Sequence, residues 1–383
     1  MNAVDAPDPL LVYGSVVGVL SILCWIAVAV RAGRAWDMRP VGEDEPEPPA
    51  PATWPAVAIL VPARHEAASL PRTLPSLLAQ DYPGPRRVIV VDDRSTDGTG
   101  DVARALGAEV VAGKDLPEGW AGKVWALHQG AAATTEPMLL LTDADILHAP
   151  GSLRRLVAES EAGALALNSR MARLRCESPA EKLLIPPFVW FFGLLYPMRR
   201  VNRPEDPTAA AAGGCVLLRR DALDRAGGFE SIRGEIIDDV NLARRVKSAG
   251  GTLRLSHSRD QVRSLREYGT LGPIWKMVRR TAFTELQRSW LRVAGTMVAM
   301  TLMFVAPPVL LAGGGVLAIL DRAYLPLAVQ GFGAWALMAN LHRAGVRHFG
   351  LLDARALLLP LAGVLYALMT LDSALRGGRG DWR

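Results

Sequence analysis

Apolar residues gather at the two ends of the chain, while the middle mixes apolar and polar positions. Residues 10–30 form an uncharged run, long enough to cross the ~30 Å hydrocarbon core of a bilayer. Three more apolar runs follow the middle part, at 294–320, 323–341 and 356–371. A buried core helix is the alternative for any single run, but three of them in close succession favour a bundle in lipid. The pattern predicts one N-terminal and about three C-terminal transmembrane helices.

Charges on either side of the first run favour a membrane anchor over a cleavable signal peptide. Asp5 and Asp8 precede the run, whereas Arg31, Arg34 and Arg39 follow it. A signal peptide would need basic residues before a shorter apolar run. Because basic flanks stay in the cytoplasm, we expect the N-terminus outside and the middle of the chain in the cytosol.

Short β-rich runs alternate with helical patterns in the middle of the chain. The runs are AVAILVPA (56–63), RVIVVDD (87–93), AEVVA (108–112) and PMLLLTDAD (137–145). Continuous apolar strands separated by helices are typical of a parallel sheet that is covered on both faces. The pattern predicts an α/β domain with a Rossmann-like, mostly parallel sheet, and such sheets bind ligands at the carboxyl ends of their strands.

These patterns divide the chain into four expected parts. They are an N-terminal anchor (1–39, span about 10–30), a linker rich in proline and acidic residues (40–55), the α/β domain (56–292) and a C-terminal transmembrane region (293–383). Within the domain, the uncharged segment 183–198 is interrupted by prolines and too short to span comfortably. We expect an interfacial helix there, with a buried core helix as the alternative.

Composition agrees with a membrane protein that has a large soluble part. Half of the residues are hydrophobic and the net charge is +5, which excludes a disordered or collagen-like chain. The three cysteines, Cys24, Cys176 and Cys215, lie far apart, so they predict free thiols and neither a disulfide framework nor a zinc knuckle.

Acidic residues stand at the predicted carboxyl ends of the strands. Asp92 and Asp93 end one strand, where they either cap a turn or hold the polar edges of a nucleoside. Asp143 and Asp145 are two residues apart in an extended segment, so their side chains point to the same side. Two carboxylates so placed are the ligands expected for Mg²⁺ or Mn²⁺ against a diphosphate.

Small and basic residues form two further candidates. Lys123 opens a predicted helix in the segment Gly-Trp-Ala-Gly-Lys, where it either contacts a diphosphate or is a plain surface lysine. Gly213 and Gly214 precede a predicted strand, and their lack of a side chain lets the backbone approach a ligand or a neighbouring strand closely.

An acidic pair and an arginine pair complete the candidates. Asp238 and Asp239 begin a predicted helix, where they either complement the helix dipole or place one carboxylate as a general base near a substrate hydroxyl. Arg279 and Arg280 belong to a basic stretch before the second apolar run. That stretch either attracts anionic lipid or faces a leaving diphosphate, and different faces of one helix can do both.

The ordered combination resembles a known family. A strand followed by VDDRSTDGT, then TDAD, GG, IIDD and an Arg-rich helix, resembles the family 2 inverting glycosyltransferases of the GT-A fold. The VPARHEA, GWAGK and WKMVRRTAF segments further resemble the hopene-associated glycosyltransferases of bacteria, and ceramide glucosyltransferases look like more distant relatives.

The resemblance implies roles for individual residues. Contacts to a nucleotide sugar, in particular a UDP-sugar, fall to Pro62, Ala63, Glu66, Asp92, Asp93, Lys123, Asp143, Arg279 and Arg280. Asp143 and Asp145 would bind the divalent metal, Mg²⁺ or Mn²⁺. Asp239 would be the general base, although Asp238 replaces the glutamate of the family's acidic pair. Gly213 and Gly214 would lie on the acceptor side.

The implied activity is a membrane-bound transfer of a sugar to a lipid hydroxyl with inversion, in hopanoid or other glycolipid biosynthesis. The expected location is the bacterial inner membrane, with the catalytic domain in the cytosol. The expected partners are the nucleotide sugar, a lipid acceptor such as a hopanoid, and membrane lipids, with no nucleic acid. A polyprenyl-phosphate glycosyltransferase and a metal-dependent nucleotidyltransferase on the same sheet are the alternatives.

Overall fold

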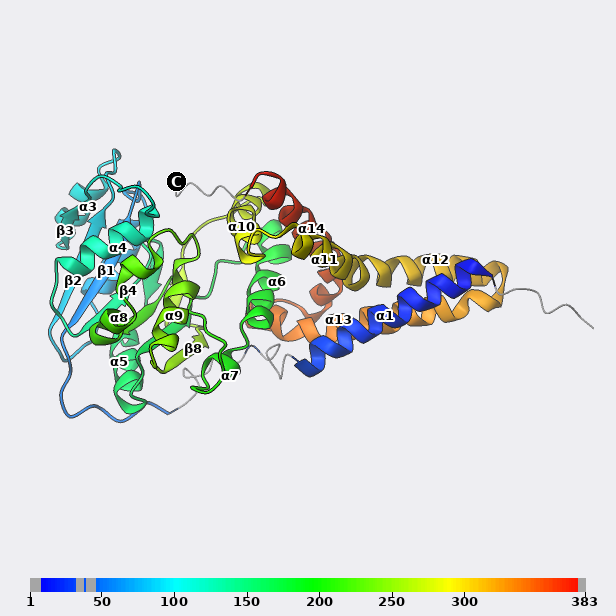
Figure 1. Cartoon of the computed structure of the whole chain (residues 1–383), viewed down its shortest axis with the longest axis horizontal. Coiled ribbons are helices and arrows are strands. Elements are labelled where there is room, and N and C mark those ends of the chain that lie inside the picture. The colour runs from blue at the N-terminus through cyan, green and yellow to red at the C-terminus, as the bar shows by residue number, and fades with distance from the viewer. Residues whose placement is uncertain (1–7, 32–37, 39–45, 378–383) are drawn as a thin grey trace, which may run out of the picture. The chain divides into compact units, whose positions relative to one another are not determined.

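The computed structural model describes residues 8–31, 38 and 46–377, which form two compact units (Figure 1). Among them, the α/β unit comprises residues 46–175 and 196–267, and the helical unit comprises 8–31, 38, 176–195 and 268–377. Of the expected linker, residues 40–45 lie outside the described part, as do Asp5, Arg34 and Arg39 of the expected flanks.

The α/β unit is built on a seven-stranded sheet of order β3-β2-β1-β4-β7-β6-β8. Its strands are β1 (Val57–Ala63), β2 (Arg86–Asp92), β3 (Glu109–Ala112), β4 (Met138–Leu141), β6 (Leu167–Met171), β7 (Val216–Arg219) and β8 (Leu253–His257). β7 runs antiparallel to β4 and β6, and the other neighbours pair in parallel. The expected α/β fold with a mostly parallel sheet is confirmed.

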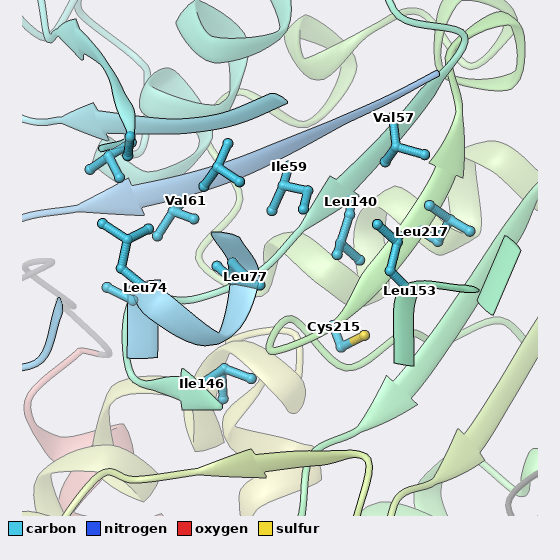
Figure 2. Packing of buried hydrophobic residues seen from close by; sticks show 14 of the residues in the cluster. Val57, Ile59, Val61, Leu74, Leu77, Leu140, Ile146, Leu153, Cys215 and Leu217 are labelled. Atoms are coloured by element: carbon cyan, nitrogen blue, oxygen red, sulfur yellow. The ribbon is translucent and has the colours of Figure 1, made fainter. Parts of the chain in front are cut away.

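Helices alternate with the strands of this unit, and the longer ones bury apolar residues in its core. The helices are α2 (Leu70–Leu78), α3 (Thr99–Ala105), α4 (Gly122–Ala132), α5 (Ser152–Ala162), α7 (Met198–Val201), α8 (Arg220–Arg225), the 3₁₀ turn η1 (Phe229–Ile232) and α9 (Asp238–Ser248). All seven residues of β1 are buried, as expected of a strand covered on both sides. On one side Val57, Ile59 and Val61 pack with residues such as Leu74 of α2 and Leu140 of β4 (Figure 2).

A second, two-stranded sheet lies in the same unit. β5 (Ile146–His148) follows the Asp143–Asp145 segment directly and pairs antiparallel with β9 (Val262–Ser264). This pairing connects the end of β4 with a segment more than 100 residues further along the chain.

The helical unit contains three helices that are long and apolar enough to cross a membrane, counted over the described residues. They are Pro9–Val30 in α1 (Pro9–Arg31), Trp290–Leu320 and Asp353–Leu375. Trp290–Leu320 comprises α11 (Trp290–Met300), a π-helical turn (Thr301–Val305) and α12 (Ala306–Leu320), so the irregular turn stands just before Pro307 and Pro308. Asp353–Leu375 comprises a 3₁₀ segment (Asp353–Leu358) and α14 (Leu359–Leu375).

Two of the three expected C-terminal runs, 294–320 and 356–371, lie in candidate spans of the described residues. The run 323–341 lies mostly within α13 (Leu325–His348), a continuous helix that packs against α12 and α1. α13 is long enough to cross a membrane, but polar residues such as Gln330, Asn340 and His342 interrupt its apolar sequence, and it is not among the candidate spans.

The helical unit also takes in two helices that the sequence analysis placed in the 56–292 domain. They are α6 (Pro179–Leu195), which covers most of the 183–198 segment, and α10 (Leu271–Glu285). Trp190 of α6 is fully buried and contacts the rings of Trp25 and His342. For this side chain the structure therefore favours the alternative of a packed core helix over one lying among lipid headgroups.

Candidate functional site

The site forms where strands of opposite direction meet at one edge of the sheet. β1, β2 and β4 are parallel, so their carboxyl ends lie at the same edge. β7 is antiparallel to β4, with Val216 opposite Leu141, so the residues before β7 lie beside the residues after β4. This register brings Gly213 and Gly214 to Thr142 and Asp143, and Thr142 Oγ1 donates to the Gly214 carbonyl at 2.8 Å.

Lys123 lies at the centre of this arrangement. Its Nζ is 2.8 Å from Asp143 Oδ1 and 3.3 Å from Asp238 Oδ2. The lysine side chain is only 19% exposed, which excludes the interpretation as a plain surface lysine. Burial lowers the pKa of Lys123, but the charges of Asp143 and Asp238 outweigh burial and raise it above its ordinary value. The ammonium therefore stays charged and joins the D-x-D segment to the acidic pair.

The two aspartates of the acidic pair differ in their contacts. Asp238 is ion-paired with Lys123, whereas Asp239 accepts backbone N–H groups from Gly213 (2.7 Å) and Val240 (2.8 Å). Burial and the charge of Asp238 raise the pKa of Asp239 to about 6, against the opposing charge of Lys123. A carboxylate with such a pKa can accept a proton near neutral pH.

The two glycines have different surroundings. A Cβ on Gly213 would lie 3.0 Å from Lys123 Nζ and 3.3 Å from Asp239 Oδ2, so this glycine leaves room for the charged groups. A Cβ on Gly214 would lie 3.1 Å from Ile146 Cδ1, so this glycine allows close packing against β5. Gly214 thus fits the interpretation of close backbone packing, and the approach of a ligand to Gly213 stays a prediction.

The D-x-D segment is held rigidly at the end of β4. Thr73 Oγ1 donates to the Ala144 carbonyl at 2.6 Å, and Leu265 N donates to the Asp145 carbonyl at 2.8 Å. Asp145 Oδ2 lies 3.3 Å from Arg266 Nε. Burial and the charge of Asp143 raise the pKa of Asp145 to about 6 despite this arginine.

The carboxylates of Asp143 and Asp145 are oxygen ligands of the kind that a hard divalent cation prefers. Within residues 8–31, 38 and 46–377, no three or more His, Cys, Asp or Glu side chains gather as a preformed metal cluster. Asp143 and Asp145 nevertheless supply two oxygen ligands close together, and their mutual repulsion and burial are the conditions that a bound cation relieves.

The residues expected to contact the nucleoside lie at the ends of β1 and β2. Asp92 Oδ1 accepts the Ser95 N–H at 3.1 Å, so Asp92 does cap the turn after its strand. Asp93 is 1% exposed and lies 3.3 Å from Arg64 NH1, and burial raises its pKa. Pro62 lines a small cavity together with Lys123, Asp143, Gly213, Asp238 and Asp239. Ala63 ends β1, and Glu66 donates its N–H to Thr99 Oγ1 in the loop that follows.

Arg279 and Arg280 belong to α10 of the helical unit, not to the α/β unit that holds the other predicted site residues. Arg279 NH1 lies 3.7 Å from Asp372 Oδ2 of α14, and its carbonyl accepts a hydrogen bond from Ser373. The contact of Arg279 and Arg280 with a diphosphate remains a prediction.

Two residues of this region were missed by the sequence analysis. Arg266 contacts Asp145, and the buried His148 lies 2.9 Å from Thr142 Oγ1 through its Nε2. Burial lowers the pKa of His148 to about 4, so it is neutral and helps to hold Thr142 in place. Both contacts depend on the β5–β9 sheet, which no local pattern predicts.

Residues 58–227 match the family model described as Glycosyl transferase family 2. Over these residues the chain is similar to glycosyl transferase family 2. A 4,4'-diaponeurosporenoate glycosyltransferase of Staphylococcus haemolyticus is 38% identical over 95 residues, which cover 24% of this chain and 24% of the relative. An uncharacterized glycosyltransferase of Mycobacterium tuberculosis is 38% identical over 109 residues, 28% of this chain and 45% of the relative. The chain thus spans less than half the length of these curated relatives.

The fold of the chain has a solved counterpart. A mannosyltransferase from Pyrobaculum calidifontis, solved in complex with GDP-Man and Mn²⁺, matches with a TM-score of 0.53 and 18% identity. The match covers 85% of this chain and 97% of that chain. At this identity the likeness shows the fold alone, and together with the sheet order it identifies the α/β unit as a GT-A domain.

Proposed function

We propose that the chain is a membrane-bound inverting glycosyltransferase that moves a sugar from a nucleotide sugar to a lipid hydroxyl. One observation carries the proposal. Within the α/β unit, Lys123 joins the carboxylates after β4 to the acidic pair at the start of α9. Groups suited to a donor diphosphate and a group suited to an acceptor proton thus lie within one site.

The donor end of the site combines carboxylates with a fixed ammonium. Asp143 and Asp145 would hold Mg²⁺ or Mn²⁺, which when bound supplies positive charge against a departing diphosphate. Asp92 and Asp93, with Glu66, would hold the base and ribose of a UDP-sugar, and the buried carboxylate of Asp93 with Arg64 beside it suits polar nucleoside edges. Lys123 would orient Asp143 and Asp238 around the donor.

The acceptor end of the site centres on Asp239. Its pKa of about 6 lets the carboxylate take the proton of an attacking hydroxyl at neutral pH, an effect of typically 10²- to 10⁴-fold. Two backbone N–H groups fix its orientation, one of them from Gly213 on the acceptor side. A single displacement by that hydroxyl inverts the anomeric centre.

A lipid acceptor is supported by the apolar helices and by one of the relatives. The described part of the chain includes three candidate membrane-spanning helices, and one relative is named 4,4'-diaponeurosporenoate glycosyltransferase. We place the enzyme in the bacterial inner membrane with its α/β unit in the cytosol, where nucleotide sugars are made. A hopanoid is the acceptor class to test first, and polyprenyl phosphates come next.

The test uses the full chain purified in detergent, with UDP and UDP-sugars as donors. We expect UDP binding that strengthens with Mn²⁺, transfer of labelled sugar to a lipid extract, and loss of the Mn²⁺ effect in Asp145→Asn. Asp239→Asn should lower turnover by about 10²-fold or more while donor affinity stays nearly unchanged. Transfer that survives in both Asp238→Asn and Asp239→Asn would contradict the mechanism. Mn²⁺-dependent transfer of a nucleotidyl group would instead identify a nucleotidyltransferase.

A further inference from the structure

Two successive backbone contacts bring Arg266 to the D-x-D segment. Antiparallel pairing of β5 with β9 sets Ile146 opposite Ser264. Beyond that pair, Leu265 N donates to the Asp145 carbonyl at 2.8 Å. Arg266 follows directly, so its position beside Asp145 is dictated by the register and not by a freely moving loop.

The guanidinium of Arg266 contacts the carboxylate expected to bind the metal. Arg266 Nε lies 3.3 Å from Asp145 Oδ2, and the arginine side chain is 52% exposed whereas that of Asp145 is 16% exposed. The guanidinium thus contacts a largely buried carboxylate while about half of the arginine side chain stays accessible to solvent. A guanidinium has five N–H donors in a planar fork, which suits bidentate contact with phosphate oxygens.

We infer that Arg266 is a donor-binding residue that exchanges partners. It neutralises Asp145 while the donor is absent, and it turns to the donor diphosphate when a divalent cation takes over that carboxylate. This inference rests on the proposed function and deepens it, because it assigns the diphosphate contact to a residue of the α/β unit.

The contacts of the two candidate arginines support this assignment. Arg266 lies in the same unit as Asp143 and Asp145 and touches the D-x-D segment directly. Arg279 lies in the helical unit, where Asp372 and Ser373 of α14 hold its side chain and its carbonyl. Arg279 thus has a role within the helical unit that requires no donor.

The exchange makes two predictions of opposite sign for Arg266→Gln. Affinity for Mn²⁺ alone should rise a few-fold, because a competing positive charge leaves Asp145. Affinity for UDP in saturating Mn²⁺ should fall about 10-fold or more, because a charge-assisted contact to the diphosphate is lost. Uridine, which has no phosphate, should bind the variant as it binds the wild type.

The experiment measures these three affinities by calorimetry on the full chain in detergent, with Arg263→Gln as the matched control. Arg263 lies on β9 with its side chain exposed, so this variant makes the same change of charge three residues away. The control should bind all three probes like the wild type. Arg266→Lys should keep Mn²⁺ affinity low yet recover UDP affinity only partly, since an ammonium cannot bind bidentately.

The outcomes separate this inference from the proposed function. A wild-type chain that binds no UDP with or without Mn²⁺ would overturn the proposed function. A wild type that binds UDP, with an Arg266→Gln variant that binds UDP equally well, would overturn only the role of Arg266. A parallel fall in affinity for Mn²⁺, UDP and uridine would show that Arg266 merely maintains the local structure, and this too would overturn the inference.

Discussion

Replacing Lys123 with methionine tests whether its ammonium holds the site together. Methionine has a similar length and no charge, so the change removes one positive charge from among Asp143, Asp238 and Asp239 and leaves packing largely intact. The main effect on stability is therefore electrostatic, because three carboxylates would then lie close together without their counterion. We expect a folded protein that is less stable and has an altered pH profile.

The expected size of the effect follows from burial. Removing one partner of a buried ion pair costs about 3–5 kcal/mol. Lys123 and Asp238 are 19% and 16% exposed, and Asp143 is 38% exposed, so solvent screens part of the interaction. We therefore expect a loss of about 1–3 kcal/mol, which in a chain of this size lowers the midpoint of thermal unfolding by about 2–6 °C.

The loss of stability in Lys123→Met should depend on pH in a definite direction. Lys123 lowers the pKa of Asp239, so its removal should raise that pKa further above about 6. A carboxyl group whose pKa is higher in the folded than in the unfolded state destabilises the protein as pH rises from the unfolded pKa to the folded pKa. The deficit of Lys123→Met should therefore be small near pH 5 and largest at pH 8. The acid limb of the transfer rate, which we expect near pH 6 in the wild type, should move to higher pH.

Thermal unfolding of the full chain in detergent, followed by intrinsic fluorescence at pH 5 and pH 8, measures the deficit. Lys123→Met/Asp238→Asn is the matched variant, because it removes one negative charge together with the positive one. It should recover a large part of the loss at pH 8. An unchanged midpoint in Lys123→Met at pH 8, or a double variant no more stable than the single one, would refute the reasoning.

Two more predictions concern the helical unit and the topology. Glu181 is fully buried and accepts backbone N–H groups from Glu177, Ser178, Tyr268 and Gly269. Burial raises its pKa, but these hydrogen bonds lower it to about 2, so its stabilisation is present above pH ~4.5 and is lost as pH falls toward 2. Glu181→Gln should cost about 2–4 kcal/mol at pH 7, and a thermal midpoint equal to that of the wild type would argue against this. The Asp101 side chain is 87% exposed, so Asp101→Cys can be labelled in a chain whose three native cysteines have been replaced. With the α/β unit in the cytosol, an impermeant maleimide should label this cysteine only after the cells are lysed. Labelling in intact spheroplasts would show the opposite orientation.

Local patterns determined the elements around the site. The apolar runs at 56–63, 87–93 and 108–112 became β1, β2 and β3. β1 is buried throughout, as a strand covered on both faces requires, whereas β3 at the sheet edge is partly exposed. The same patterns placed Asp143 at a strand end and Asp238 at the start of a helix. The three cysteines were expected not to form a disulfide framework, and none of them is in a disulfide in the structure. Each of these inferences needed only the chain within a few residues of the position concerned.

Only the tertiary structure decided which of these residues meet. The antiparallel direction of β7 sets Gly213 beside Asp239 and Lys123, and the β5–β9 register sets Arg266 beside Asp145. Packing also grouped α6 and α10 with the helical unit, although both lie within the span expected for a single domain. The physical reason is that strand direction, register and helix packing depend on contacts between residues far apart in the chain. A local run of apolar and polar residues shows where a strand or helix forms, but it does not specify its neighbour.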